Sequence, residues 1–166
     1  MPELQIRPAR ARDAHAVGQV LTRSYAQLLS GDYCDTLLQR ALPILTRPRP
    51  ELLGSPGYMV ALRDGRIVAA GGWSRVNPYG GEVHRVGHVR HVACDPGSLR
   101  TGVARELMLS AMEQAREVGI GLLSCLSTLT AIPFYRSLGF EGEAEIDIRL
   151  EPGLYFPAVE MRKRLS

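Results

Sequence analysis

The chain has 166 residues, of which 45% are apolar and 22% are charged, so it fits one globular domain and is neither disordered nor collagen-like. The net charge of +3 comes from lysines and arginines that are scattered among acidic residues rather than gathered in a run. Because a nucleic-acid-binding surface needs a clustered basic stripe, no nucleic-acid partner is expected, and the small surplus would suit a compact polyanionic ligand equally well.

The cysteines and the hydropathy indicate the compartment. Cys34, Cys94 and Cys125 are an odd number of cysteines at wide spacing, which predicts free thiols in a reducing environment. The sequence opens without an apolar signal core, and no stretch approaches the length of a membrane span. We therefore expect a cytoplasmic protein without a membrane partner.

In chain order, the pattern first predicts a short strand and two helices. Apolar and polar residues alternate over residues 4–7, as in a strand. An apolar stripe at three- and four-residue spacing then predicts a helix from about residue 12, with Asp13 as its N-cap or first-turn acid. A second helix is expected over residues 35–45, before the prolines in residues 46–51 interrupt regular structure.

The middle of the chain predicts strands. An Asp-Gly pair between the apolar runs 58–62 and 67–73 is typical of a β-hairpin. A flexible loop over residues 77–82 precedes a long strand over residues 83–94.

The remaining pattern alternates helices with strands. It predicts a helix over residues 101–118, a strand over 122–126, a short helix over 130–138 with Thr130 as N-cap, and final strands over 144–150 and 159–163. The order favours an α/β architecture, in the sense of mixed α+β layers around one sheet. Without repeats or a convincing boundary, residues 1–166 are expected to form a single domain.

The segment from Cys94 to Leu107 combines a strand end, a turn and a helix start. The first amides of a helix lack partners and carry partial positive charge, so they can hold a phosphate that approaches closely. Gly102 and Ala104 would give clearance, Arg100 and Arg105 would add charge, and the Ser98 hydroxyl would donate a further hydrogen bond. Taken alone, the same residues could merely ease helix entry, and the pattern is neither a P-loop nor a dinucleotide fingerprint.

Two motifs resemble those of the GNAT N-acetyltransferase superfamily. The run V-A-C-D-P-G-S-L-R-T-G-V-A-R-E-L-M resembles the central motif of the superfamily, although Leu99 stands where Gln or Arg is usual. The run T-L-T-A-I-P-F-Y-R-S-L-G-F resembles its second signature, with Thr130 where many relatives have Asn. The resemblance implies a mostly antiparallel central sheet whose fourth and fifth strands splay apart between flanking helices.

The resemblance further implies acetyl-CoA as cosubstrate and no metal. Backbone amides near residues 100–105 would hold the pyrophosphate, and the pantetheine arm would lie along the strand that ends at Cys94. The implied cofactor-binding residues are Val92, Ala93, Cys94, Arg100, Thr101, Gly102, Val103, Ala104, Arg105, Thr130 and Tyr135.

By the same resemblance, Tyr135 is the acid that protonates the departing thiolate. A nearby phenol can donate a proton as charge develops on the sulfur. The alternative is that Tyr135 is a packing residue beside Phe134 and Phe140.

The base that takes the proton of the acceptor amine has no clear signature. Glu82 and His88 are candidates, and bulk water is a third. His84 and His88 would share one face of a regular strand while His91 points to the other, which argues against a three-histidine metal site.

The acceptor is expected to be a small-molecule amine or the amine of a peptide or protein. The first two helices (including Tyr33 and Asp35), the loop over residues 77–82 and the Tyr155-Phe156 connection should bound its site. Arg85, Arg90 and the histidines suggest an acceptor with a carboxylate.

The favoured hypothesis is an N-acetyltransferase that transfers the acyl group directly, with homodimers common among members of that superfamily. A catalytically silent acyl-CoA-binding or regulatory domain on the same fold is the alternative, and the departures at Leu99 and Thr130 support it. A protein-interaction domain without a cofactor would leave both motifs unexplained.

Overall fold

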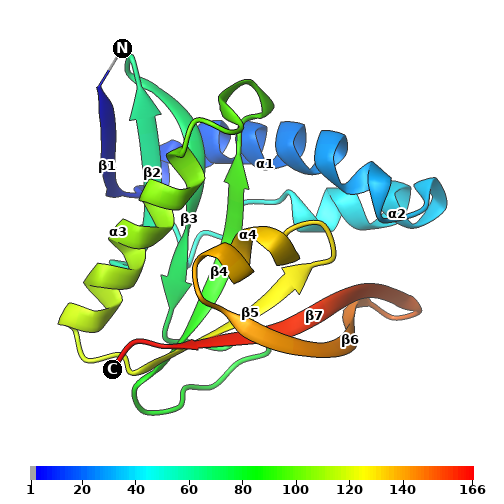
Figure 1. Cartoon of the computed structure of the whole chain (residues 1–166). Coiled ribbons are helices and arrows are strands. Elements are labelled where there is room, and N and C mark those ends of the chain that lie inside the picture. The colour runs from blue at the N-terminus through cyan, green and yellow to red at the C-terminus, as the bar shows by residue number, and fades with distance from the viewer. Residues whose placement is uncertain (1–2) are drawn as a thin grey trace.

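The computed structural model of the protein describes residues 3–166 and contains one mixed sheet of seven strands in the order β1-β2-β3-β4-β5-β7-β6 (Figure 1). The only parallel neighbours among the described strands are β4 and β5. The strands are β1 (Leu4–Pro8), β2 (Tyr58–Arg63), β3 (Arg66–Ser74), β4 (Val86–Cys94), β5 (Leu122–Thr128), β6 (Glu141–Glu151) and β7 (Leu154–Arg164). The expected mixed α/β architecture is confirmed.

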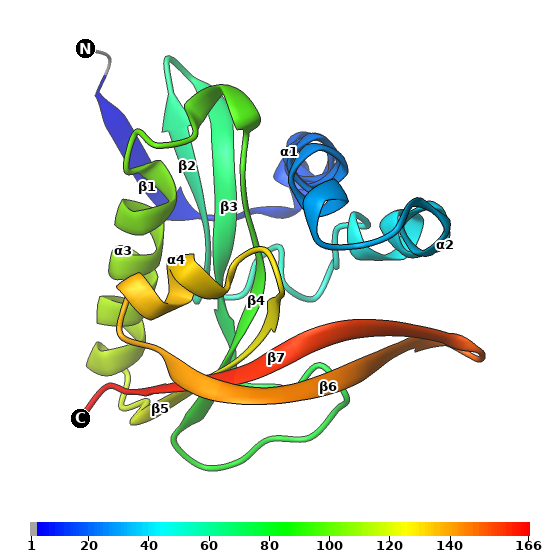
Figure 2. The same ribbon diagram turned by 45° about the vertical axis from the view of Figure 1, so that its right-hand side comes forward.

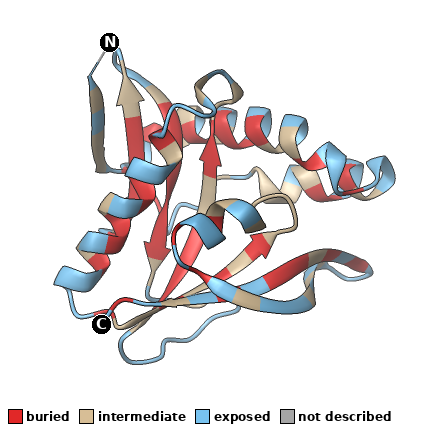
Figure 3. Cartoon of the chain, in the orientation of Figure 1, coloured by how far each residue is buried: buried red, intermediate tan, exposed pale blue. Residues whose placement is uncertain are grey.

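Helices cover both faces of this sheet, as Figure 2 shows. The α-helices are α1 (Ala14–Leu28), α2 (Asp35–Leu45), α3 (Val103–Glu117) and α4 (Ile132–Ser137). Alternate residues of β2 enter different cores: Met59 packs in the core that contains α3, and Tyr58 packs in the core that contains α1. Figure 3 shows the buried residues gathered on the inner strands and on the sheet-facing sides of α1 and α3.

The turns explain how the elements are connected. The β2–β3 hairpin turns at Asp64 and Gly65, whose φ angles are 54° and 74°, as the Asp-Gly pair predicts. The expected strand start at residue 83 is wrong, because Val86 donates its amide to the carbonyl of Val83 and Arg85 has a φ of 63°. These residues form a turn, and β4 begins only at Val86.

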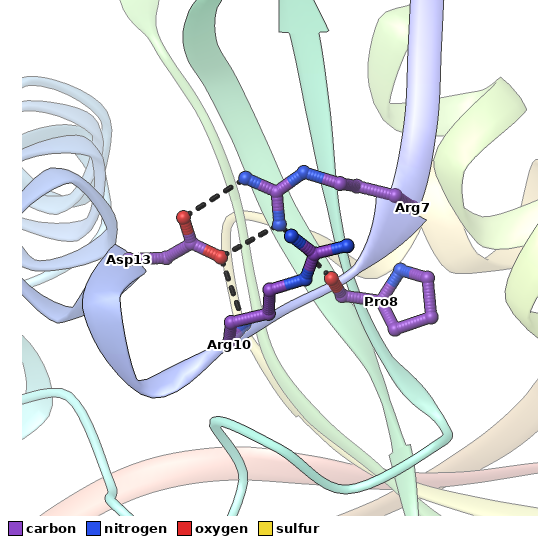
Figure 4. Close-up of polar contacts among 4 residues, drawn as sticks. All are labelled: Arg7, Pro8, Arg10 and Asp13. Atoms are coloured by element: carbon purple, nitrogen blue, oxygen red, sulfur yellow. Dashed lines mark hydrogen bonds and ion pairs between the residues drawn. The ribbon is translucent and has the colours of Figure 1, made fainter.

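A largely buried ion pair joins the first strand to the first helix (Figure 4). The guanidinium of Arg7 donates to both carboxylate oxygens of Asp13 at 2.8 and 2.9 Å, and the amide of Arg10 donates to the same carboxylate at 2.8 Å. Asp13 occupies the N-cap position of α1 but makes no side-chain cap bond there. Its carboxylate instead fixes the β1–α1 turn, and the hydrogen bonds from Arg7 lower its pKa.

We expect Asp13→Asn to reduce the free energy of unfolding by about 2 kcal/mol, because it removes charge-assisted bonds and leaves Arg7 without its counter-charge. Since the folded-state pKa of Asp13 is lowered, its contribution is complete above the ordinary value of 3.8 and is lost as the pH falls further. Urea unfolding at pH 7 and pH 3 measures both effects. As a control, Glu113→Gln breaks an exposed pair with Arg116 and should cost less than about 0.5 kcal/mol. Equal effects of the two substitutions would contradict the assignment.

Candidate functional site

The site is built where β4 and β5 separate. The two strands are paired only at Val86–Leu122, Gly87–Leu123 and His88–Ser124. Beyond these pairs β5 stays paired with β7 alone, and β4 stays paired with β3. The strands diverge toward their C-terminal ends, as both views show (Figures 1 and 2).

A β-bulge bends β4 within this diverging part. His91 and Val92 together oppose Gly71 of β3, and His91 has a φ of 44°, a left-handed conformation that is uncommon for residues other than glycine. A Cβ atom on Gly71 would lie 2.9 Å from Cγ2 of Val92, so the partner strand needs glycine for this close approach. Gly72 is needed for the contact with the segment before β2, because a Cβ on Gly72 would lie only 2.0 Å from the carbonyl oxygen of Gly57.

Two tyrosines hold the carbonyl groups of the bulge. The hydroxyl of Tyr58 donates to the carbonyl of His91 at 2.9 Å, and the hydroxyl of Tyr25 donates to the carbonyl of Val92 at 3.3 Å. Burial raises the pKa of both phenols, so both remain protonated donors. These bonds come from β2 and α1, and they tie the bent strand to both elements.

Next to the bulge, backbone amide and carbonyl groups of β4 point into the gap between the separated parts of β4 and β5. The amide of Asp95 donates to the carbonyl of Val68 in β3 at 2.7 Å. Because successive residues of a strand direct their amides and carbonyls to alternate sides, those of Cys94 face the side where β5 has separated. These groups could pair with an extended ligand or hold a developing oxyanion.

A cavity of about 280 Å³ and one of about 250 Å³ lie along the parted strands. The smaller one is bordered by six of the predicted cofactor-binding residues: Val92, Ala93, Cys94, Ala104, Thr130 and Tyr135. The other five predicted residues, which are Arg100, Thr101, Gly102, Val103 and Arg105, lie at or beside the start of α3.

The start of α3 presents free amides. Within residues 3–166, no hydrogen bond is donated by the amides of residues 100–105. Gly102 caps the helix with a φ of 82°, and a Cβ built there would have no atom within 4 Å. The segment can therefore accept an anion without displacing protein atoms. Arg105, in contrast, donates to the carbonyl of Ser137 at 3.3 Å and so ties α3 to α4.

Tyr135 is buried in the wall of the smaller cavity. Edge-to-face contacts at centroid distances of 5.3 Å to Phe134 and 5.5 Å to Phe140 orient its ring. Burial raises its pKa well above the ordinary value, and the neighbouring Cys125 thiol acts in the same direction. The phenol therefore stays protonated and can serve as a proton donor.

The expected N-cap role of Thr130 is wrong. The helix begins at Ile132 after Ala131, and the hydroxyl of Thr130 donates to the carboxylate of Asp32 at 2.7 Å. It is Thr128 whose hydroxyl accepts the amide of Ala131 at 3.2 Å. Thr130 thus joins this turn to the segment before α2 while it still borders the cavity.

The larger cavity shares Tyr25, Val89, His91, Leu126 and Thr128 with the smaller one. Its other borders come from α2, the segment between α2 and β2, the loop after β3, Arg90 of β4 and the β6–β7 hairpin. Of these, α2, the loop after β3 and the region of Tyr155 and Phe156 in the hairpin were expected to bound the acceptor, whereas the segment between α2 and β2 was not. Tyr33 and Asp35 do not line it. Tyr33 instead supports the wall, because its hydroxyl donates to the carbonyl of Pro157 at 2.6 Å and its ring stacks on Phe156 at 4.3 Å.

The structure separates the candidate bases. Glu82 is exposed, bridges Val76 and lines neither of the two cavities. His88 is buried in β4 and borders a neighbouring cavity of about 160 Å³, with its Nε2 atom unpaired. His91, which the sequence did not single out as a base, borders both cavities beside the parted strands, and burial with the charge of Arg90 lowers its pKa to about 4.

Sequence reasoning also missed Tyr25. Its place in the apolar stripe of α1 concealed it, and the adjacent glycines Gly71 and Gly72 were the sequence signal for the bulge that it holds. No cluster of His, Cys, Asp and Glu among residues 3–166 is arranged to hold a metal ion. None of the helices in this range has the length and apolar character needed to cross a bilayer.

The parted strands, the bulge and the open start of α3 define a class of protein that can hold an elongated ligand with an anionic end. Residues 22–140, more than half of the chain, match the model of the acetyltransferase (GNAT) family. The chain therefore belongs to this family, and the resemblance seen in its two motifs is confirmed. No curated protein matches the sequence.

Solved structures share the fold over nearly the whole chain. A GCN5-related N-acetyltransferase from Rhodopseudomonas palustris is 17% identical with a TM-score of 0.80, covering 99% of this chain and 96% of that one. The PaiA N-acetyltransferase from Thermoplasma acidophilum, solved with coenzyme A, is 14% identical with a TM-score of 0.74, covering 98% and 99%. YncA from Salmonella typhimurium, solved with its cofactor acetyl-CoA, is 20% identical with a TM-score of 0.67, covering 99% of this chain and 95% of that one.

His91 should make the protein less stable as the pH falls from 6.5 to 4. Its pKa lies near 4 in the folded chain against an ordinary 6.5, so the unfolded chain takes up the proton first. At 1.36 kcal/mol per pKa unit this difference corresponds to about 3 kcal/mol. We expect His91→Asn, whose side chain tolerates the left-handed backbone, to remove most of this pH dependence in urea unfolding. His15→Gln, on the exposed side of α1, serves as the control. The buried His88, whose pKa is also lowered, should leave a smaller residual pH dependence. A pH dependence that survives undiminished in His91→Asn would refute the assignment.

Proposed function

We propose that this protein transfers an acetyl group from acetyl-CoA directly to an acceptor amine, with residues 1–166 acting as one cytoplasmic acetyltransferase domain. One observation carries the proposal: the free amides of residues 100–105 lie at the start of α3, and the cavity beside the parted strands contains the protonated phenol of Tyr135. Membership of the GNAT family and the coenzyme A and acetyl-CoA complexes of two structural relatives support the same reaction.

The residues present fit acetyl-CoA. The amides of residues 100–105 and the open space at Gly102 suit a diphosphate, and Arg100 adds positive charge beside them. The gap-facing amide and carbonyl of Cys94 suit an extended arm that needs backbone partners. Leu99 replaces the usual polar residue, but a backbone cradle needs no particular side chain.

The transfer balances without a further reactant. The amine nitrogen forms a bond to the thioester carbonyl carbon, the carbon–sulfur bond breaks, and the amine proton leaves. The sulfur accepts a proton from the phenol of Tyr135, which afterwards regains one from solvent. The gap-facing amide of Cys94 stabilises the carbonyl oxygen as it becomes negative.

Direct transfer is favoured over an acyl-cysteine intermediate because the nearby thiols are poor nucleophiles. Burial raises the pKa of Cys125 to about 12 and that of Cys94 to about 11, so neither is a thiolate at neutral pH. The side chain of Cys94 is buried, which fits a packing role.

The proton of the amine passes to His91 or to water. His91 borders both cavities and is neutral above a pH of about 4, so its imidazole can accept a hydrogen bond from the attacking amine. An imidazole of such low pKa holds a proton weakly, and water completes the transfer. Glu82 and His88 are less suitable, because neither borders both cavities.

A silent acyl-CoA-binding domain is the second candidate. It is favoured by one observation, which is that no carboxylate stands among the residues shared by the two cavities. Binding without thiol release over a panel of small amines and peptide amines would select this alternative.

Acetyl-CoA should raise the melting temperature of the wild-type protein, because a ligand that binds only the native state stabilises it by mass action. We expect Gly102→Glu to abolish this rise by adding bulk and negative charge where the diphosphate binds. Gly119→Glu is the matched control, since Gly119 follows the other end of α3 with a φ of 89° and equally open space. A normal rise in Gly102→Glu would refute the placement of the cradle, and no rise in the wild-type protein would refute both candidate functions.

Tyr135→Phe should lower the turnover number by about 100-fold or more, the usual size of a general-acid contribution. The dissociation constant of acetyl-CoA should change by less than about twofold, because the ring and its aromatic contacts remain. Thiol release measures turnover, and calorimetry measures binding. Tyr155→Phe, on the exposed side of β7, is the control and should behave as the wild-type protein. Unchanged turnover in Tyr135→Phe would exclude the acid role.

A further inference from the structure

The larger cavity is unusually rich in positive charge. Arg49, Arg90 and Arg149 all line it, and the only carboxylate among its lining residues is that of Glu51. None of the three arginines forms an ion pair with any residue in the range 3–166. The cavity therefore carries a surplus of two positive charges on its rim and wall.

Arg90 is the member of this group that the fold has buried. Its exposed fraction is 9%, and one guanidinium nitrogen donates to the hydroxyl of Ser74 at 3.0 Å. Arg7 provides a comparison within the same molecule, since that partly buried arginine has both carboxylate oxygens of Asp13 as partners. The charge of Glu51 acts on Arg90 without an ion pair between them, and the charge of Arg49 opposes it. A buried guanidinium without an ion-pair partner is costly, so its retention at a cavity favours a ligand that supplies a direct counter-charge.

The position of Arg90 relates this charge to the reaction. It immediately precedes His91, which borders both cavities, so a group bound by Arg90 would place the rest of a small molecule near the parted strands. The volume of about 280 Å³ suits a molecule of amino-acid size. The planar guanidinium fork matches carboxylate and phosphoryl oxygens, which it can bind through two parallel hydrogen bonds.

We propose that the acceptor is a small amine that also carries an anionic group, and that Arg90 binds this group with help from Arg49 and Arg149. The proposal rests on the proposed function, because it names the substrate class of the same site. The positive surroundings would also lower the pKa of the bound amine and increase the fraction present as the free base that attacks the thioester.

Three matched sets of ligands test it: α-amino acids, their neutral α-carboxamides, and 1-aminoalkylphosphonates with the same side chains. Binding to the protein saturated with coenzyme A is measured by calorimetry, and acetylation is measured by thiol release. We expect at least one anionic series to bind about tenfold or more tightly than the carboxamides, as one charge-assisted bond allows. The better of the two anionic series identifies the group as a carboxylate or a phosphoryl group. Equal affinity for anionic and neutral ligands would overturn the proposal.

Substitutions of the arginines test which of them produces the preference for anionic over neutral ligands. Arg90→Gln should reduce the ratio of anionic to neutral affinity to near one while leaving carboxamide binding unchanged, and Arg90→Lys should restore part of it. Arg149→Gln, at an exposed position, should lower the ratio two- to threefold without endangering the buried core. Arg66→Gln, in the β2–β3 hairpin and outside the lining of either main cavity, is the control. A full preference that survives both Arg90→Gln and Arg149→Gln would refute the assignment.

The outcomes separate this inference from the proposed function. A wild-type protein that acetylates carboxamides as efficiently as the anionic amines keeps its function and loses only the anion site. A protein whose melting temperature does not respond to acetyl-CoA loses the proposed function, whichever amines it binds.

Discussion

The interruption of the β4–β5 ladder after His88 and Ser124 is the constraint on which the site depends. In a continuous sheet, the polar groups of both edges would be consumed by pairing, and no ligand could reach them. The bulge at His91 and Val92 bends β4 away, and the hydroxyls of two tyrosines hold its carbonyls in that bent form. The open edge is therefore a rigid part of the fold, and it can recognise an extended ligand through its backbone.

The two cavities beside this edge differ in their electrostatics. Tyr135 is surrounded by aromatic rings and a thiol that remains neutral, and burial keeps its proton in place. The larger cavity contains guanidinium groups that form no ion pair with the described residues 3–166, and they disfavour a further positive charge on a bound amine. The smaller cavity thus keeps a proton on Tyr135 that can be donated, and the larger cavity promotes loss of a proton from the bound amine. The surroundings of the two groups, rather than their ordinary pKa values, set these opposite roles.

The sequence was most informative where local chemistry decides the structure. The sequence predicted a helix over about residues 35–45, which are the observed bounds of α2, and the Asp-Gly pair predicted the β2–β3 turn. Prediction was poorer where tertiary contacts decide. The hydroxyl of Thr130 donates to the carboxylate of Asp32, which is distant in sequence. The hydroxyl of Thr128, rather than that of Thr130, accepts the amide of Ala131 just before α4. The open edge of β4 is formed by backbone groups, which have no side-chain signature in the sequence. It was therefore predicted only through the family resemblance, and Gly71 and Gly72 are its only local sequence signal.

The acceptor side was the least predictable because its walls come from elements without motifs. The family match ends at residue 140, whereas Arg149 and Phe156 reach the larger cavity from the β6–β7 hairpin beyond that point. The amides that would hold a diphosphate lie on α3, which contributes no residue to that cavity. Substitutions in the hairpin can therefore change the charge and shape of the acceptor cavity without disturbing the start of α3. A common donor site and a variable acceptor site are compatible in one fold because different elements supply them, and the parted strands are where the two meet.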